Sequence, residues 1–428
     1  MTPEVKQRIE QIRQGIVPKG YKKTKTDIVP ADWKESPIGE YIREYTEKTT
    51  IPNQYPVLTS ARTGLMLQTD YYSNRQVTTE DNVGYNILPY GYITFRSRSD
   101  DGRFRFNENR IIERGVISYF YPVFSFSEEV CHEYMLYLLN FSIYRRMYPY
   151  AEGTAQQVLS LKKLGQLKYS LPLVAEQKKI AEILSTQDKA IKLQERKIEE
   201  LKRFKKGCLE KMFPRKGQKV PEKRFPGFTG DWEQRKLGDI GKARSGVGFP
   251  DAEQGGVTGI PFFKVSDMNL DGNESEMTVA NNYVTAEQIA VHRWSPITEL
   301  PAIFFAKVGA AVMLNRKRLC RFPFLLDNNT MAYSLSSTKW DADFAKALFG
   351  TVDLTSLVQV GALPSYNAGD VESMEIYLPS LLEQEQIGGF FKQLDNLITL
   401  HQRKLDEMKK QKKALMQLLL TGIVRVRL

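Results

Sequence analysis

The chain of 428 residues contains one motif twice, and this duplication constrains its fold more than any other feature. The motif L-P-x-x-x-E-Q-x-x-I begins at Leu171 and again at Leu378. Over 36 gapless positions from each leucine, 14 residues are identical. The similarity also extends upstream, where an Asp-Trp pair at Trp33 recurs at Trp232. We therefore interpret the chain as a tandem duplication with pseudo-twofold symmetry, because two copies of this length do not make a solenoid.

A long helix is predicted after each motif. Residues 176–212 and 383–420 lack proline and are rich in Glu, Lys, Leu and Ile, a composition that favours helix. Apolar residues recur at spacings of three and four, which predicts a seam along one face. The predicted seam residues are Ile180, Leu184, Ile191, Ile198 and Leu201 in the first helix, and Ile387, Phe391, Leu394, Ile398, Leu405 and Met408 in the second.

Polar residues interrupt both seams at equivalent positions. Gln194 and Lys205 of the first helix align with His401 and Lys412 of the second. Shared polar positions indicate a shared register, so we expect the helices to pair as an antiparallel coiled coil. The alternative is that each amphipathic helix packs on its own globular half. Ser380 also predicts a capping box with Glu383 at the start of the second helix.

The duplication sets the predicted boundaries of the parts. These are an N-terminal helix and basic loop at 1–30, a variable domain at 31–170, a helix at 171–213, a basic Pro/Gly-rich linker at 214–230, a second variable domain at 231–377, and a helix with a C-terminal tail at 378–428. We expect the N-terminal segment to pack against the C-terminal helix, so that the two ends complete the pseudo-symmetry.

Each variable domain reads as a mixed α/β (α+β) fold. Short β-rich runs are bounded by Gly, Pro, Asn or Asp, and one helix follows them in each copy, at 128–147 and 341–360. The predicted strands are Tyr55–Leu58, Gly91–Phe95, Val116–Phe120, Ile260–Val265, Ile303–Ala306 and Met331–Leu335.

The charge balance favours a polyanionic partner. Lys and Arg number 61 against 50 Asp and Glu, a net charge of +11. Nucleic acid is the first candidate, and a solvated basic surface is the alternative. No apolar run is long enough for a membrane span and no secretory signal is visible, so we expect a cytoplasmic protein. Three cysteines and three scattered histidines predict neither a disulfide framework nor a metal centre.

Candidate DNA-binding residues cluster in loop-like stretches. Arginine reads guanine edges, asparagine reads adenine, and both Lys and Arg neutralise phosphates. The alternating Arg-Phe pattern at 103–106 predicts a hairpin with arginines outside and aromatic rings inside. For any single residue the alternative is an ordinary surface position, where the charged side chain is solvated or forms an ion pair within the protein. The candidates are Arg62, Arg96, Arg98, Arg103 and Arg105 in the first domain, and Lys242, Arg244, Lys264, Asn315, Arg316, Lys317 and Arg318 in the second.

Catalytic signatures are missing from the sequence. It contains no phosphate-binding P-loop, no dinucleotide fingerprint, no amino-methylation tetrapeptide, no serine elbow and no H-E-x-x-H motif. In a basic, duplicated chain this favours a binding protein, so no catalytic, cofactor-binding or metal-binding residues are predicted.

The repeated motif opening a long charged helix, together with the R-F-P-G-F-T-G-D-W stretch at 224–232, resembles the specificity subunit of type I restriction-modification systems. The resemblance covers essentially the whole chain and is weakest inside the variable domains. It implies that each variable domain is a target-recognition domain that reads one half of a bipartite duplex DNA sequence. The paired helices would set the spacing between half-sites.

The resemblance also implies partners. Two methyltransferase (modification) subunits and motor/nuclease (restriction) subunits would assemble on the chain, and would carry S-adenosylmethionine, ATP and magnesium, with no cofactor on this chain. Two alternatives stay open. One is a solitary decoy or adaptor that binds DNA or RNA, and the other is an enzyme with an unrecognised active site.

Overall fold

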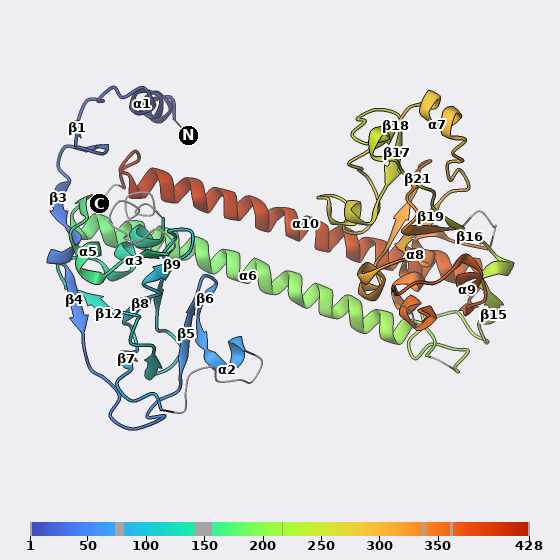
Figure 1. Cartoon of the computed structure of the whole chain (residues 1–428), viewed down its shortest axis with the longest axis horizontal. Coiled ribbons are helices and arrows are strands. Elements are labelled where there is room, and N and C mark those ends of the chain that lie inside the picture. The colour runs from blue at the N-terminus through green and yellow to red at the C-terminus, as the bar shows by residue number, and fades with distance from the viewer. Residues whose placement is uncertain are drawn as a thin grey trace. The chain divides into compact units, whose positions relative to one another are not determined.

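The structure, a computed structural model, describes residues 2–72, 81–141, 156–215, 217–335, 339–359 and 363–426. Contacts divide the chain into two compact units. Unit 1 comprises Met1–Leu193 and Leu405–Leu428, and unit 2 comprises Gln194–Lys404. The two long helices, α6 (Val174–Met212) and α10 (Leu381–Leu420), each contribute a part to both units (Figure 1).

Unit 1 begins with α1 (Pro3–Arg13) and is otherwise built mainly of short antiparallel strands. A four-stranded sheet of order β10-β8-β12-β4 packs against α3 (His132–Phe141). Smaller helices are α2 (Gln68–Tyr71) and α5 (Leu161–Gly165). The strands are β1 (Tyr21–Lys23), β2 (Ile28–Pro30), β3 (Lys34–Pro37), β4 (Ile42–Tyr45), β5 (Leu58–Ala61), β6 (Gly64–Leu67), β7 (Asn86–Pro89), β8 (Ile93–Phe95), β9 (Arg98–Ser99), β10 (Phe106–Glu108), β11 (Arg114–Ile117), β12 (Val123–Phe126), β13 (Gln157–Val158) and β14 (Lys168–Leu171).

Unit 2 has the same arrangement as unit 1, a four-stranded sheet with one helix packed against it. Its main sheet has the order β16-β22-β19-β20 and packs against α8 (Ala342–Thr351), while β17 pairs in parallel with β21. Shorter helices are α7 (Ala286–His292) and α9 (Ala368–Glu372). The strands are β15 (Glu233–Lys236), β16 (Lys242–Ser245), β17 (Ile260–Phe263), β18 (Tyr283–Val284), β19 (Ala302–Ala306), β20 (Lys317–Cys320), β21 (Leu325–Leu326), β22 (Thr330–Ser334) and β23 (Glu375–Leu378).

The mixed α/β class is confirmed, and the structure corrects several predicted bounds. Residues 118–120 form part of a turn instead of ending a strand, and the strand expected from Tyr55 begins at Leu58. The first predicted domain helix begins at His132, and residues 142–147 of that prediction lie outside the described residues. The second ends at Thr351, because the chain turns there into a short 3-10 helix at 354–357.

The long helices pair in an antiparallel manner, as predicted. In unit 1, Gln187 Nε2 donates to Met408 O at 3.3 Å. In unit 2, Gln194 Nε2 donates to His401 O at 2.8 Å. Ion pairs join Lys412 to Asp188 in unit 1 and Lys205 to Asp395 in unit 2. Gln187 therefore lies beside Met408, and Gln194, which is further along α6, lies beside the earlier residue His401 of α10. The two helices thus run in opposite directions.

The predicted seam residues divide into two groups. Buried ones are Ile180, Leu184, Ile191, Ile198, Ile387, Phe391, Leu394 and Leu405, and half-buried ones are Leu201, Ile398 and Met408. Ile180 and Leu184 belong to the domain core of unit 1, and Ile387 and Phe391 to that of unit 2. The first turns of each helix therefore pack on their own domain. The last turns are also part of a core, Met212 in unit 2 and Leu419 and Leu420 in unit 1, and helix pairing occupies the stretch between.

Two polar residues of the motif anchor each helix start. Glu176 is bound through two hydrogen bonds by Arg425, and Glu383 likewise by Arg224. The next residue, Gln384, accepts a hydrogen bond from Asp341 N at the start of α8 and donates to Pro379 O at 3.2 Å. The predicted capping box is half correct, since Ser380 Oγ accepts from Glu383 N at 3.4 Å but the Glu383 carboxylate binds Arg224.

The two ends of the chain meet within unit 1. Arg8 Nη1 donates to Ile423 O, and Tyr21 Oη to Gly422 O, each at 2.8 Å. Gly422 has a φ of +72° and lies against Pro30 and Trp33, so a side chain there would be strained and would clash. The N-terminal segment was expected to pack on the C-terminal helix, and these contacts instead fall on the tail that directly follows α10.

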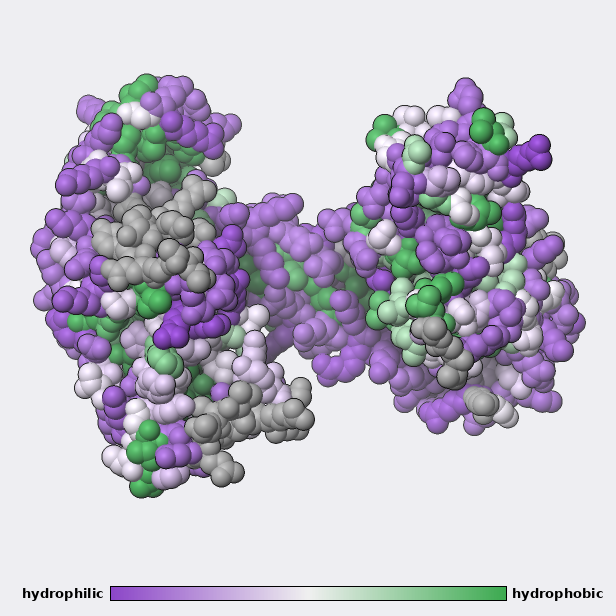
Figure 2. All heavy atoms as spheres, viewed as in Figure 1, coloured by the Kyte–Doolittle hydropathy of each residue, from purple (hydrophilic) through white to green (hydrophobic). Residues whose placement is uncertain are grey.

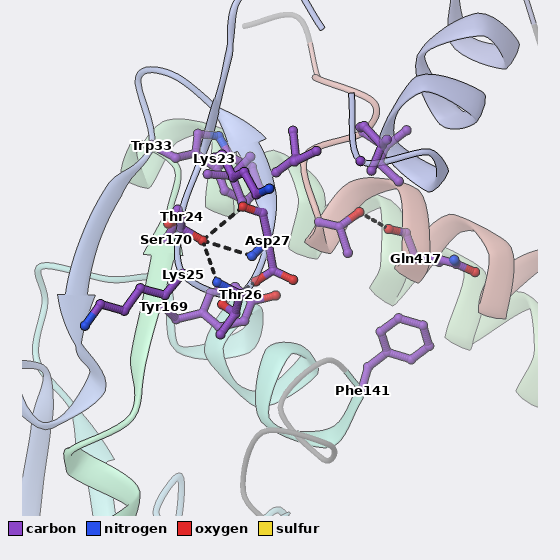
Figure 3. A pocket seen from close by; sticks show the side chains of 16 residues that line it. Lys23, Thr24, Lys25, Thr26, Asp27, Trp33, Phe141, Tyr169, Ser170 and Gln417 are labelled. Atoms are coloured by element: carbon purple, nitrogen blue, oxygen red, sulfur yellow. Dashed lines mark hydrogen bonds between the residues drawn. The ribbon is translucent and has the colours of Figure 1, made fainter. Parts of the chain in front are cut away.

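A cavity of about 690 Å³ lies where these segments meet (Figure 3). The β1–β2 hairpin contributes Lys23 through Val29, the end of β14 contributes Tyr169 and Ser170, and α10 contributes Gln417. The indole Nε1 of Trp33, whose side chain lines this cavity, is buried and forms no hydrogen bond within the described part of the chain.

Candidate nucleic-acid interface

Five predicted arginines come together in unit 1. Arg62 lies in the β5–β6 turn, Arg96 follows β8, Arg98 lies on β9, and Arg103 and Arg105 precede β10. All five line one pocket of about 340 Å³, together with Tyr71, Tyr72 and Tyr121. We call this pocket, with all the residues that line it, the arginine groove. All five have exposed side chains, as a surface that meets a polyanion requires.

The alternating Arg-Phe pattern explains how the groove forms. Phe104 and Phe106 are 6% and 1% exposed, whereas Arg103 and Arg105 point to solvent. The ring centroid of Phe106 lies 4.7 Å from that of Phe95, inside the core. The predicted division into an aromatic inner face and a basic outer face is therefore confirmed for this hairpin.

Asp101 orders two of the arginines. Its carboxylate pairs with Arg62 at 2.8 Å and with Arg103 at 3.8 Å, and it accepts a hydrogen bond from Ser99. Desolvation alone would raise the pKa of Asp101, but the hydrogen bonds from Arg103 N and Ser99 and the charge of Arg62 lower it. Among the described residues, neither Arg96 nor Arg98 forms an ion pair, so no carboxylate of the protein competes with a ligand for either guanidinium group.

The seven candidates of the second domain occupy three separate segments. Lys242 and Arg244 lie on β16, Lys264 follows β17, and residues 315–318 lead into β20. Lys242 is exposed, while Arg244 contacts Ser295 and Lys264 donates to Gln254 at 2.9 Å.

The basic residues around β20 bind acceptors of their own domain. Arg316 Nη1 donates to Asn269 at 2.7 Å and Arg318 Nε to Asn273 O at 2.6 Å. Lys317 donates to Asn315 Oδ1 and to Val352 O, and burial lowers its pKa to about 8. These three side chains therefore hold β20 and its neighbouring loops together, whereas Lys242 stays open to a ligand.

Sequence reasoning missed the tyrosines of the groove. Tyr71 and Tyr72 lie at the end of α2, and Tyr121 at the end of the turn before β12. Their sequence separation from the arginines hides the association. The available signal was the pairing of aromatic residues in two loop-like stretches, at 71–72 and 119–121.

Exposed leucines occupy equivalent positions on the two long helices. Leu193 on α6 is 69% exposed in unit 1, and Leu400 on α10 is 63% exposed in unit 2. The offset between them is the 207 residues of the repeat. The helix surface is otherwise largely hydrophilic in the view of Figure 2.

No described helix has both the length and the apolar character needed to cross a membrane. Among the described residues, no group of three His, Cys, Asp or Glu side chains is arranged to hold a metal ion.

The fold and the groove together define a duplicated recognition protein of two α/β domains and two antiparallel helices. The sequence matches the family described as the type I restriction modification DNA specificity domain twice, over residues 30–203 and 229–410. The chain belongs to this family, whose members are non-catalytic recognition subunits of type I restriction-modification systems. The predicted tandem duplication is confirmed by the two matches.

Individual relatives agree with the family. The type I restriction enzyme MjaVIII specificity subunit of Methanocaldococcus jannaschii is 24% identical, over 93% of this chain and 94% of the relative. The putative MjaX specificity subunit of the same organism is 28% identical, over 69% of this chain and 68% of its own.

Two solved structures share the fold. The S subunit of a type I restriction-modification system from M. genitalium has a TM-score of 0.53 at 15% identity, covering 96% of this chain and 100% of that one. A chain from a study of assembly and conformational transition of the type I R-M system has a TM-score of 0.57 at 13% identity, covering 92% and 99%.

Proposed function

We propose that the chain reads a bipartite duplex DNA target, with one half-site per globular domain and the spacing set by the antiparallel helices. The arginine groove carries this proposal, because it gathers five exposed cations and three tyrosines on one face of the first domain. The duplication supplies a second domain of the same plan, although different side chains would read its half-site.

Energetics favour two linked half-sites. Lys and Arg contacts to phosphates supply affinity that does not depend on sequence. Each bidentate contact to a base edge discriminates by about 1–3 kcal/mol, so a half-site of a few bases is read weakly. A rigid connection raises the effective concentration of the second half-site once the first is bound.

We further propose that the long helices dock two copies of a methyltransferase subunit. Leu193 and Leu400 support this, because equivalent exposed leucines present the same feature twice to identical partners. Motor/nuclease subunits would join the same complex. S-adenosylmethionine, ATP and magnesium would be bound by these partner subunits, and this chain would supply recognition.

Methylation mapping tests the proposal. Single-molecule sequencing of the native genome, with and without this gene, measures methylated adenines directly. We expect a split sequence with a fixed unread gap to lose methylation when the gene is deleted. An unchanged methylation pattern would contradict the proposal and favour a decoy or adaptor that binds nucleic acid.

Substitutions in the groove localise DNA binding. Arg96→Ala with Arg98→Ala removes two cations that form no ion pair with any described residue, so binding of the methylated sequence should weaken while methyltransferase subunits still co-purify. Arg43→Ala, which removes an exposed arginine outside the groove, serves as the control. Loss of co-purification in the groove variant would place this surface at a protein interface instead.

A further inference from the structure

The turn between β11 and β12 presents two aromatic rings to solvent. Tyr119 and Phe120 are its central residues, and Tyr121 N donates to Ser118 O at 2.9 Å to close it. The two rings are 54% and 43% exposed, and their centroids lie 4.1 Å apart. Aromatic side chains supply much of the binding energy where proteins meet partners, so a paired, exposed set is a candidate contact.

Side chains from outside the turn hold it rigidly. Ser97 Oγ donates to Phe120 O at 2.7 Å. Asn86 Nδ2 donates to Tyr121 O at 2.9 Å, and the ring of Tyr85 packs edge-on against Tyr119. A pre-organised turn loses little conformational entropy when its rings are buried against a ligand.

The turn is continuous with the arginine groove. The guanidinium of Arg98 lies 4.6 Å from the centre of the Phe120 ring, and Arg98 and Tyr121 both line the groove. A ligand that fits this surface carries closely spaced negative charges beside flat apolar faces. The phosphates and bases of nucleic acid have this chemistry, because every base offers a face on which an aromatic ring can stack.

We propose that Tyr119 and Phe120 form an aromatic wedge that inserts at a base step of duplex DNA held in the arginine groove. Insertion unstacks that step and kinks the duplex beside the half-site of the first domain. The wedge adds a preference for flexible pyrimidine–purine steps, since these deform most easily. This inference rests on the proposed DNA recognition and deepens it.

The same unit contains a matched control. Tyr90 is 52% exposed on another turn, and Arg110 lies 5.7 Å from its ring centre. Arg110 is paired with Glu108 at 2.8 Å and with Glu133 at 3.5 Å, so this second aromatic turn lies among acidic groups that repel phosphate. Tyr90→Ala therefore removes an aromatic ring that is as exposed as Tyr119 and also lies near an arginine, but that does not line the groove.

The test uses the assembled complex and a duplex that carries the methylated sequence found by genome sequencing. 2-Aminopurine, whose fluorescence rises when it is unstacked, is placed at successive positions through the first half-site and its flanks. We expect wild type, Tyr90→Ala and the conservative Tyr119→Phe to raise the signal severalfold at one step. Tyr119→Ala with Phe120→Ala should abolish this rise and weaken binding about 5- to 150-fold.

Three results would overturn the wedge. One is a double variant that keeps both the fluorescence rise and the affinity. The second is a double variant that no longer co-purifies with the methyltransferase, which would assign the turn to a protein contact. The third is a wild-type complex that binds and methylates the duplex with no fluorescence rise at any position. A wild-type complex that does not bind the duplex would instead refute the proposed function, and the wedge with it.

Discussion

At the scale of single residues, the motif glutamates explain why the sequence pattern exists. Glu383 is fully buried, and Arg224 binds it through two charge-assisted hydrogen bonds of 2.6 and 2.7 Å. Glu176 has the same arrangement with Arg425, which also reaches Asp32. The motif was found from the sequence alone, but its arginine partners were not, because neither Arg224 nor Arg425 belongs to the repeated motif.

Neutralising a motif glutamate should destabilise its own unit. Glu383→Gln leaves the Arg224 guanidinium, which is 15% exposed, without its counter-charge, and breaking such a pair costs roughly 3–5 kcal/mol. Denaturant unfolding of unit 2, followed by hydrogen exchange, measures this cost. Glu385→Gln changes an exposed neighbour on the same helix and should be nearly neutral. Equal stabilities of the two variants would show that the pair contributes nothing.

A second residue-scale prediction concerns pH and Asp395. Burial alone would raise the pKa of Asp395, but Lys205 and Lys346 lower it below 3.8, its ordinary value. A depressed carboxyl pKa in the folded state stabilises the protein above the unfolded pKa, and the benefit is lost as the pH falls through the folded pKa. The stability difference between wild type and Asp395→Asn should therefore be full above about pH 5 and shrink below 3.8. A stability difference that is equal above pH 5 and below pH 3.8 would contradict this prediction. Asp271→Asn, which changes an exposed aspartate, is the control.

At the scale of elements, the long helices were predictable, whereas the groove was predicted only through its five arginines and not through the other residues that line it. Helix bounds and seam residues follow from a local periodicity, so the sequence alone indicates them to within two residues at the start of each helix. The groove draws on residues from Thr59 to Tyr121, which only the tertiary fold brings together. The candidates around β20 show the converse, since their charges suggest a ligand but their hydrogen bonds go to their own domain.

Helix length should determine the gap in the DNA target. Repeating residues 194–200 in α6 and 398–404 in α10 adds one heptad to each helix and keeps the antiparallel register of the Gln194–His401 contact. Seven residues lengthen a helix by about 10 Å, or roughly three base pairs of DNA. Sequencing of methylated adenines should show a gap longer by that amount.

The control for this experiment is an insertion in α6 alone. It shifts the seam residues of α6 out of register with those of α10, so we expect a less stable protein and no methylated sequence with a longer gap. A paired insertion that leaves the gap unchanged would show that something other than the helices sets the spacing.

At the scale of the whole molecule, the basic surplus does not reside where recognition is proposed. Lys and Arg number 16 against 16 Asp and Glu in residues 31–170, and 13 against 18 in residues 231–377. The net charge of +11 therefore comes from the helices, the linker and the two ends. The total charge indicated a polyanionic partner, but only the fold reveals that the first domain concentrates its arginines in one groove.

The C-terminal tail should stabilise unit 1 specifically. Removing residues 421–428 deletes Arg425 and Gly422, leaving Glu176 buried without its arginine and uncovering Trp33. Hydrogen exchange should accelerate in β3 and β14 of unit 1 and stay unchanged in β15 and β23 of unit 2. Removing only residues 427–428 keeps both Arg425 and Gly422 and serves as the matched truncation control. Equal acceleration in both units would contradict a local role.

The reciprocal ion pairs have a genetic consequence. Asp188 pairs with Lys412 and Lys205 with Asp395, so each helix carries one acid and one base at equivalent places in the repeat. A crossover at equivalent positions of the two repeated gene segments would keep an acid and a base at these places, because each segment encodes both. The symmetry of these ion pairs would therefore let recombination exchange the globular domains while both contacts between the helices are kept.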